Sequence, residues 1–312
     1  MNAVAVRPIS MHLHSFSLRF RLRRGQDFSV FDYIDTAADL GFTGVNISAN
    51  GPANRDLGGT TAEHFATVNR HVKGRRMRLE LDTSDTRPAH LTTMIGVAAA
   101  CGADTLRVYT KYAGTLGELI EWTVADLTAI APVAEAAGVL VVLENHEDFQ
   151  GAAIAEILGR VASPWVRALY DYGNSQMVGE DPIDALTAMS SFTSRVHLKD
   201  HVVLVDGGRF WVQGVAVGDG RLPIIQQTQR LYDAGVRRFC FENVWGYRAP
   251  VLTDPSSLAT TPWSGTDHDH RLLDGADLPI DEAVEQEWDA LQRGWAWLRS
   301  HLAGAGYVIE RE

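Results

Sequence analysis

The stretch Val141-Val142-Leu143-Glu144-Asn145-His146 joins a short apolar run to a group of polar side chains. The run is typical of a strand buried in a parallel sheet, and Glu144 stands where that strand would end. Three later apolar runs also lead into a polar residue of the same kind, namely Asp171, His197 and Glu242. Helix-length segments separate the four runs, so this part of the chain is predicted to repeat a strand and helix unit.

The same alternation extends over most of the chain. The expected strands cover residues 9–16, 44–48, 77–82, 105–109, 139–145, 166–172, 194–199 and 237–244. Eight strands in series, most of them continuously apolar, predict an α/β protein that forms a single (β/α)8 TIM barrel. An open doubly wound sheet is the alternative, but the chain has no glycine-rich phosphate loop of the kind such sheets use.

No change of composition marks a domain boundary, so one barrel domain is expected to span residues 1–312. Long loops are expected after the first and the eighth strand. The segments that we expect to form a lid or to contact a partner are about 17–27, 201–217 and 246–279.

Composition narrows the class of protein. The chain has 312 residues, of which 46% are hydrophobic and 21% are charged, as in ordinary globular proteins. A net charge of −11 argues against nucleic acid as a partner. With two distant cysteines, no apolar leader and no apolar run of membrane-spanning length, the expected location is the cytoplasm, without a membrane contact.

The carboxyl ends of parallel barrel strands meet at one face, so Glu144, Asp171, His197 and Glu242 are expected to lie close together. Three carboxylates and one imidazole form an oxygen-rich site that suits Mn²⁺ best, or Mg²⁺ or Co²⁺. Each residue alone has an ordinary structural explanation, such as a solvated strand end, a turn cap or a buried histidine. Four in succession favour one divalent metal.

Two further residues share a face with these ligands because side chains alternate along a strand. His146 lies beside Glu144, and either of them is a candidate catalytic base. Lys199 lies beside His197, and it either contacts a substrate oxygen or pairs with a carboxylate.

The remaining candidates are substrate-binding residues. Arg107 lies on the fourth strand, and the preferred interpretation is that it neutralises Glu80 inside the barrel. The full set of candidates comprises His14, Arg107, Tyr109, Asn174 and Trp245.

These segments resemble the xylose-isomerase-like TIM-barrel superfamily of sugar phosphate isomerases and epimerases, over residues 9–302. The motifs that carry the resemblance are Glu144-Asn145-His146, Asp171-Tyr172-Gly173-Asn174, His197-Leu198-Lys199-Asp200, Gly218-Asp219-Gly220 and Glu242-Asn243. The resemblance implies that Glu144, Asp171, His197 and Glu242 bind one Mn²⁺-like ion.

Two departures from relatives in that superfamily bear on the activity. Asn174 stands where endonuclease IV relatives have a zinc-binding histidine and where ketose 3-epimerases usually carry a histidine. Asp200-His201-Val202-Val203 also replaces a region in which those epimerases place an arginine. Together with His146 and the long loops, this pattern looks like the large subunit of bacterial C-glycoside deglycosidases, which work with a small β-rich subunit.

The resemblance therefore implies a lyase that removes an α-proton from a 3-oxo-glycoside, forms a metal-stabilised enolate and cleaves the C-glycosidic bond by β-elimination. The alternative is a keto-sugar or sugar-phosphate isomerase or epimerase, which shares the enolate step. A metal-containing, sugar-binding scaffold subunit without turnover is the alternative outside the enzymes. Assembly into an oligomer is expected in each case.

Overall fold

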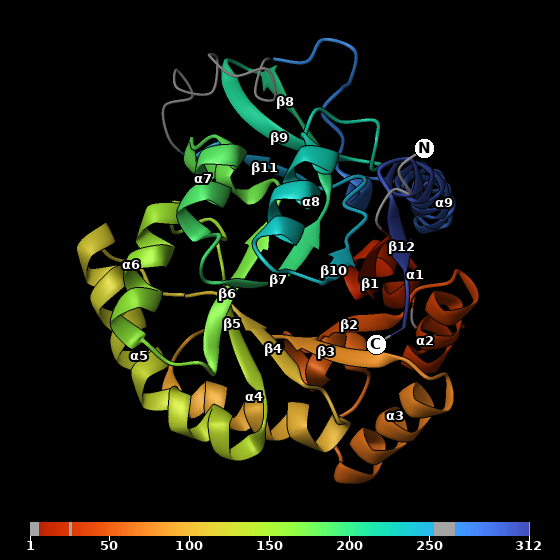
Figure 1. Ribbon diagram of the computed structural model, residues 1–312. Helices are drawn as coiled ribbons and strands as arrows, with labels where there is room; N and C mark the ends of the chain where they lie inside the picture. Colours follow the sequence, from red (N-terminus) through yellow and green to blue (C-terminus); the bar gives the residue numbers. More distant parts are fainter. Residues whose placement is uncertain (1–5, 25–26, 253–265, 312) are drawn as a thin grey trace.

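The computed structural model describes residues 6–24, 27–252 and 266–311. Eight parallel strands form a closed barrel (Figure 1), and Met11 of the first strand lies opposite Phe239 of the last. The barrel strands are β1 (Arg7–His14), β2 (Gly44–Ser48), β3 (Arg78–Asp82), β4 (Thr105–Val108), β5 (Leu140–Glu144), β6 (Val166–Asp171), β7 (Thr193–Leu198) and β10 (Arg238–Phe241). The predicted TIM barrel is confirmed, and the open doubly wound sheet is excluded because β1 pairs with β10.

Helices surround the barrel and follow its strands in turn (Figure 1). Two of them begin with a capping box, in which Ser29 and Thr115 exchange hydrogen bonds with the third residue of the helix. The helices are α1 (Arg19–Arg24), α2 (Val30–Asp39), α3 (Ala62–Gly74), α4 (Pro88–Cys101), α5 (Leu116–Ala137), α6 (Gly151–Val161), α7 (Pro182–Met189), α8 (Ile224–Asp233) and α9 (Ile280–Gly304). Among the residues described, no helix is both long enough and apolar enough to span a membrane.

The main apolar core lies between the barrel and its helices. Outward-facing strand residues such as Met11 and Leu13 belong to it, together with the inner faces of the helices. The buried residues Val142, Leu169 and Cys240 are outside that cluster, because they alternate with it on the inward face. The barrel interior is instead rich in buried polar and charged side chains, and these face the site at one end.

A second, three-stranded antiparallel sheet lies beside the barrel (Figure 1), formed by β8 (Asp200–Asp206), β9 (Arg209–Val215) and β11 (Arg248–Pro250). The predicted insertion 201–217 therefore contains a hairpin, which turns at Gly207 and Gly208 with φ of 56° and 75°. A Gly-Gly pair between apolar runs is a recognised hairpin signal. The predicted insertion 246–279 begins with β11, and its residues 253–265 lie outside the described part of the chain, as do residues 25–26 of the insertion 17–27.

Short elements complete the loops. The 3₁₀ helices are η1 (Ser15–Leu18), η2 (Pro52–Leu57), η3 (Asn174–Val178) and η5 (Gly275–Asp277). The final strand β12 (Tyr307–Ile309) adds to the beginning of β1. Gly214 of β9 donates a backbone hydrogen bond to Tyr247 (2.8 Å), which ties the second sheet to the loop after β10. A Cβ at Gly214 would lie 2.1 Å from the Val244 carbonyl oxygen, so this close approach requires glycine.

Candidate active site

A cavity of about 150 Å³ opens at the carboxyl ends of the barrel strands. The strand register brings together residues from β1, β2, β4, β5, β7 and the loops that follow them. The cavity is lined by His14, Phe16, Ser48, Asn50, Arg55, Arg107, Tyr109, Glu144, His146, Asn174, Lys199, Glu242, Val244 and Tyr247.

Glu144, Asp171 and His197 form a compact buried group on three adjacent strands. Each contributes one atom of a metal-ligand type, and these atoms lie within 4.8 Å of one another. Glu144 Oε2, Asp171 Oδ2 and His197 Nδ1 are buried and have no hydrogen-bond partner. Each of these atoms lies near a charged or titratable neighbour: Glu144 Oε2 near Arg107, Asp171 Oδ2 near Lys199, and His197 Nδ1 near Glu144. Their grouping on adjacent strands makes the three residues a candidate ligand set for a cation.

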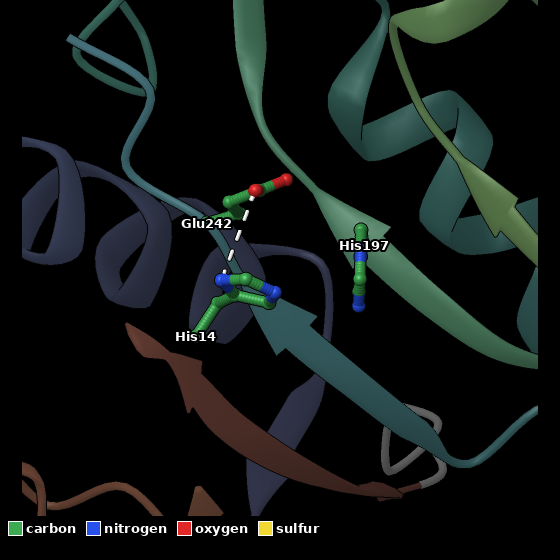
Figure 2. A group of neighbouring side chains, drawn as sticks. All are labelled: His14, His197 and Glu242. Carbon is green, nitrogen blue, oxygen red and sulfur yellow. Dashed lines mark ion pairs between the residues drawn. The ribbon is translucent and has the colours of Figure 1, made fainter. Parts of the chain in front are cut away.

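His197 also belongs to a second group with His14 and Glu242, whose ligand-type atoms again lie within 4.8 Å of one another. Figure 2 shows the His14 ring below Glu242, with His197 to the right of both, and His14 Nδ1 lies 3.8 Å from Glu242 Oε1. Both nitrogens of His14 are already used. Nδ1 accepts a hydrogen bond from the Phe16 backbone (2.9 Å), and Nε2 lies 2.6 Å from Asp82 Oδ2.

His14 is therefore better suited to orient its neighbours than to coordinate an ion. Its ring packs edge-on against the ring of His197, with 4.8 Å between the centroids. Glu242 follows β10, and its backbone N–H donates to the Leu198 carbonyl of β7 (2.8 Å), which extends the sheet and fixes the position of its side chain.

Arg107 occupies a position that the sequence did not anticipate. Its Nη2 lies 2.6 Å from Asp82 Oδ2, and its Nε lies 3.3 Å from Glu144 Oε2. The preferred interpretation that Arg107 neutralises Glu80 is wrong, because Glu80 pairs with two other arginines further down the barrel. Arg107 lies one layer higher, at the level of the cavity.

Lys199 lies between carboxylates on the other side of the site. Its ammonium is 3.0 Å from Asp171 Oδ2 and 3.9 Å from Glu242 Oε2, and it donates a hydrogen bond to Asn174 Oδ1 (2.6 Å). The amide of Asn174 in turn donates to Glu144 Oε1 (3.4 Å). Asn174 thus connects the lysine to the carboxylate of β5.

Burial and the neighbouring charges shift the pKa values of Asp171, Glu144 and His197. Burial raises the pKa of Asp171 to about 6, although Lys199 opposes the shift. Burial opposes ionisation of Glu144 as well, but Arg107 and His197 hold its pKa well below its usual range. For His197, burial lowers the pKa, but the carboxylates of Glu144 and Asp82 outweigh this and raise it to about 9.

The donor set fits a hard divalent cation. Four buried carboxylates and two buried cations surround the site, namely Asp82, Glu144, Asp171, Glu242, Arg107 and Lys199. With neutral histidines, these groups have an excess of two negative charges. Carboxylate oxygens with one imidazole are the ligands that Mn²⁺ and Mg²⁺ accept. A divalent cation would offset the excess charge and could be bound by the clustered atoms of Glu144, Asp171 and His197.

Comparison with known proteins agrees with this geometry. The sequence matches the family described as "Xylose isomerase-like TIM barrel" over residues 34–261, which is more than half of the chain. The chain belongs to the xylose isomerase-like TIM barrel family.

Other proteins are similar to this chain in sequence or in structure. The uncharacterised protein YihM of Escherichia coli K12 is 23% identical over 250 residues, covering 78% of this chain and 76% of YihM. The crystal structure of D-psicose 3-epimerase with D-tagatose from Clostridium cellulolyticum H10 has a TM-score of 0.64 and 14% identity, covering 92% of this chain and 98% of the other. The 3-keto-D-glucoside 4-epimerase YcjR from E. coli has a TM-score of 0.56 and 13% identity, covering 82% and 98%.

Beyond the candidate ligands of this xylose isomerase-like barrel, His146 is held by an aromatic contact. Its ring stacks on Tyr109 with 4.0 Å between centroids and 9° between planes. Its Nδ1 is buried without a hydrogen-bond partner, and burial lowers the pKa of the ring. A neutral imidazole with a free nitrogen at the cavity is able to accept a proton.

Trp245, predicted to face the substrate, lies outside the cavity. It packs edge-on against Phe20 with 6.3 Å between centroids. Tyr247, two residues further on, lines the cavity instead, because the loop turns at Gly246, where φ is 71°.

The sequence analysis also missed Phe16, Ser48, Asn50 and Arg55, which line the cavity from η1, β2 and the segment after β2. Ser48 ends a barrel strand, so the rule that found the ligands would have found it. The other three lie in irregular segments and carry no periodic signal.

Proposed function

We propose that this protein is a divalent-metal-dependent isomerase or epimerase that acts on a keto-sugar by removing a proton from the carbon next to the carbonyl. The observation that carries the proposal is the buried cluster of Glu144, Asp171 and His197, whose ligand-type atoms lie within 4.8 Å of one another, next to a cavity that Glu144 and Glu242 line. Membership of the xylose isomerase-like family and the fold shared with two sugar epimerases support it.

In this proposal Glu144, Asp171, His197 and Glu242 hold the metal, with Mn²⁺ as the first candidate and Mg²⁺ or Co²⁺ as alternatives. When bound, a divalent metal would polarise the sugar carbonyl and its neighbouring hydroxyl, which makes the adjacent C–H acidic. His14, through Asp82, keeps the rings and carboxylates of this group in position.

The proton itself is moved by residues of the cavity. Glu144 lies on β5 and Glu242 follows β10, so the two carboxylates reach the cavity from strands separated by β6 and β7. Two groups on different sides of a planar enolate would allow a proton to leave one face and return to the other, which is what an epimerase requires. His146 is a third group that can accept a proton, and Lys199 can donate to a substrate oxygen.

A sugar would be bound mainly by neutral contacts. Phe16 and Tyr247 pack edge-on with 6.0 Å between centroids at the cavity, and Tyr109 lies beside His146. Aromatic rings of this kind bind the apolar face of a sugar, while Ser48, Asn50 and Asn174 offer hydrogen bonds to its hydroxyls.

The second candidate is the lyase that cleaves a 3-oxo-C-glycoside, with a small β-rich partner subunit. The observation that favours it is His146, which provides a proton-transfer group in addition to the two glutamates. Elimination of a phenolic aglycone requires a separate acid at the leaving group, and an imidazole is suited to that task.

Incubation in D₂O tests both candidates. The purified protein with Mn²⁺ is given, in separate reactions, D-fructose, D-tagatose, a 3-keto-glucoside and a 3-oxo-C-glycoside, and the α-carbon is followed by NMR. Deuterium incorporation with epimerised product supports the epimerase. Free aglycone from a 3-oxo-C-glycoside, without epimerised sugar, would replace it with the lyase. Tight metal binding with neither reaction would favour a binding scaffold.

A further inference from the structure

A second cavity lies at the opposite end of the barrel, where the strands begin. It has a volume of about 390 Å³, and four arginines line it, Arg167 of β6, Arg195 of β7, and Arg237 and Arg238 at the start of β10. Thr193 and Ser194 add two hydroxyl groups. Its lining, taken from the described residues, includes no carboxylate.

Two of these arginines are fixed by the carboxylates of Glu80, which is buried, and Asp104, which is half-buried. Arg195 Nε lies 2.9 Å from Glu80 Oε1, and Arg238 Nη1 lies 3.0 Å from the same oxygen. Arg238 Nη1 also lies 2.7 Å from Asp104 Oδ1. Ion pairing within the barrel accounts for Arg195 and Arg238 as structural residues.

Ion pairing does not account for the other two. Arg167 donates to the Ser191 carbonyl (2.7 Å), and Arg237 donates to the carbonyls of Tyr232 (2.6 Å) and Val236 (2.9 Å). Neither guanidinium has a carboxylate within 4.0 Å among the described residues. The carbonyls orient both groups but leave their charge uncompensated.

The four lining guanidinium groups have only Glu80 and Asp104 as ion-pair partners, and Asp104 is shared with Arg78 (3.5 Å), so this cavity carries an excess of positive charge. His12 Nδ1 lies 3.8 Å from Glu80 Oε2, but burial lowers the pKa of His12 to about 4, so it adds no charge near neutral pH. This excess stands out in a chain with a net charge of −11. Guanidinium groups from three strands that face one cavity suit a tetrahedral oxyanion, which they bind through paired N–H donors.

We propose that this cavity binds a phosphate group, either as inorganic phosphate or as the phosphate of a small ester. The site is separate from the candidate active site, because it lies at the other end of the same strands, and it does not depend on the proposed sugar chemistry. Arg167 and Arg237 supply the uncompensated charge, and Arg195 and Arg238 supply fixed donors.

The test is calorimetric titration of the metal-loaded protein with inorganic phosphate and, separately, with glycerol 3-phosphate, at constant ionic strength. Saturable binding is expected, and the Arg167→Gln/Arg237→Gln double variant should weaken it at least about tenfold. The matched control is Arg160→Gln/Arg293→Gln, which removes two arginines that pair with surface carboxylates. Affinity in this control should stay within about twofold of wild type.

Further variants guard against misleading results. Arg237 is exposed, so the Arg237→Gln single variant should remain folded, and it is expected to weaken binding about threefold. Glu144→Gln is expected to lose the metal, so it is compared with wild type titrated without metal, and equal phosphate affinity in the two separates this cavity from the metal site. Stronger binding of the ester than of free phosphate would identify an organic phosphate as the ligand. Absence of saturable binding, or equal affinity in wild type and the double variant, would overturn the proposal.

Discussion

The two ends of the barrel interior carry opposite charge. At the carboxyl end, carboxylates outnumber cations, and several acceptor atoms have no partner. At the amino end, arginines outnumber carboxylates; Arg195 and Arg238 pair with Glu80, whereas Arg167 and Arg237 donate to backbone carbonyls. Strand β3 contributes to both ends, with Glu80 below and Asp82 above, two residues apart on one face.

The difference shows how one architectural rule serves two purposes. Inward-facing residues two positions apart on the barrel strands form successive layers across the interior. Each layer can therefore carry its own charge without any change to the apolar core outside the strands. Acceptors without partners indicate a site for a cation. In the lower layer, the ion pairs of Arg195 and Arg238 stabilise the barrel. Arg167 and Arg237 are the exceptions, because neither pairs with a carboxylate.

The largest effect is expected from removing the carboxylate that holds the lower layer. Glu80→Gln leaves Arg195 and Arg238 buried with only Asp104 for charge compensation, so the free energy of unfolding should fall by about 3–5 kcal/mol. Urea denaturation measures this. Glu121→Gln, which breaks the exposed pair with Arg160, should cost at most about 1 kcal/mol. Equal losses in the two variants would show that the lower layer is not a stabilising network.

A change in the upper layer should affect the metal rather than the fold. Glu144→Gln keeps the shape of the side chain but removes a negatively charged metal ligand. Changes to residues that only support ligands weaken metal binding about 10- to 100-fold. Affinity for Mn²⁺ should therefore fall by more than about 100-fold in Glu144→Gln. Elemental analysis after dialysis should find about one metal per chain in wild type and almost none in the variant.

Glu156→Gln is the matched control for that experiment, because it makes the same chemical change on an exposed carboxylate of α6. It should retain the metal of the wild type. Full metal content in Glu144→Gln would mean that Glu144 is not a ligand of the metal.

The pH dependence of metal binding sharpens the comparison further. A metal takes neutral His197, yet this residue has a pKa of about 9 in the metal-free protein and is protonated at pH 7. Binding should therefore release one proton, and affinity should rise about tenfold per pH unit between pH 7 and 8.5, and level off above about pH 9.

Titration calorimetry in two buffers of different ionisation enthalpy measures the proton released. Below about pH 6 a second proton should be released, because burial raises the pKa of Asp171 to that value. Affinity that is flat from pH 7 to 8.5 would exclude His197 as a ligand.

The smallest effect is expected from the aromatic support of His146. Tyr109→Leu removes the stacked ring, and since such contacts contribute about 0.5–1.5 kcal/mol, kcat should fall about two- to tenfold. Tyr109→Phe keeps the stack and should retain nearly full activity. If both variants lose activity equally, the Tyr109 hydroxyl matters rather than the stacking, and the pH profile of kcat would remain unchanged in Tyr109→Leu.

The sequence predicted the barrel because strand ends and apolar periods are local signals. It placed Glu144, Asp171, His197 and Glu242 at one end for the same reason, and the structure groups His197 with each of the other three, while Glu144 and Glu242 line the cavity. Their roles as ligands remain a prediction.

What the sequence could not supply is the pairing of charges between strands. Whether Arg107 meets Glu80 or Asp82 depends on the stagger of β3 and β4, in which Asp82 lies opposite Arg107. The position of Trp245 relative to Tyr247 depends on a turn at Gly246 and on packing against Phe20. Stagger and loop packing are set by tertiary contacts, and these leave no period in the sequence.

Closure of the barrel by β1 and β10 has a consequence for how the chain folds. The closing pairs, such as Ser10 with Arg238, join residues more than two hundred positions apart, so the last step of folding brings together distant parts of the chain. Until then the facing edges of β1 and β10 lack their closing partner and are open to association with other chains. Glu242 directly follows the closing strand, so the proposed metal site is complete only in a closed barrel. The rate at which a refolding chain acquires metal would therefore report the moment of closure.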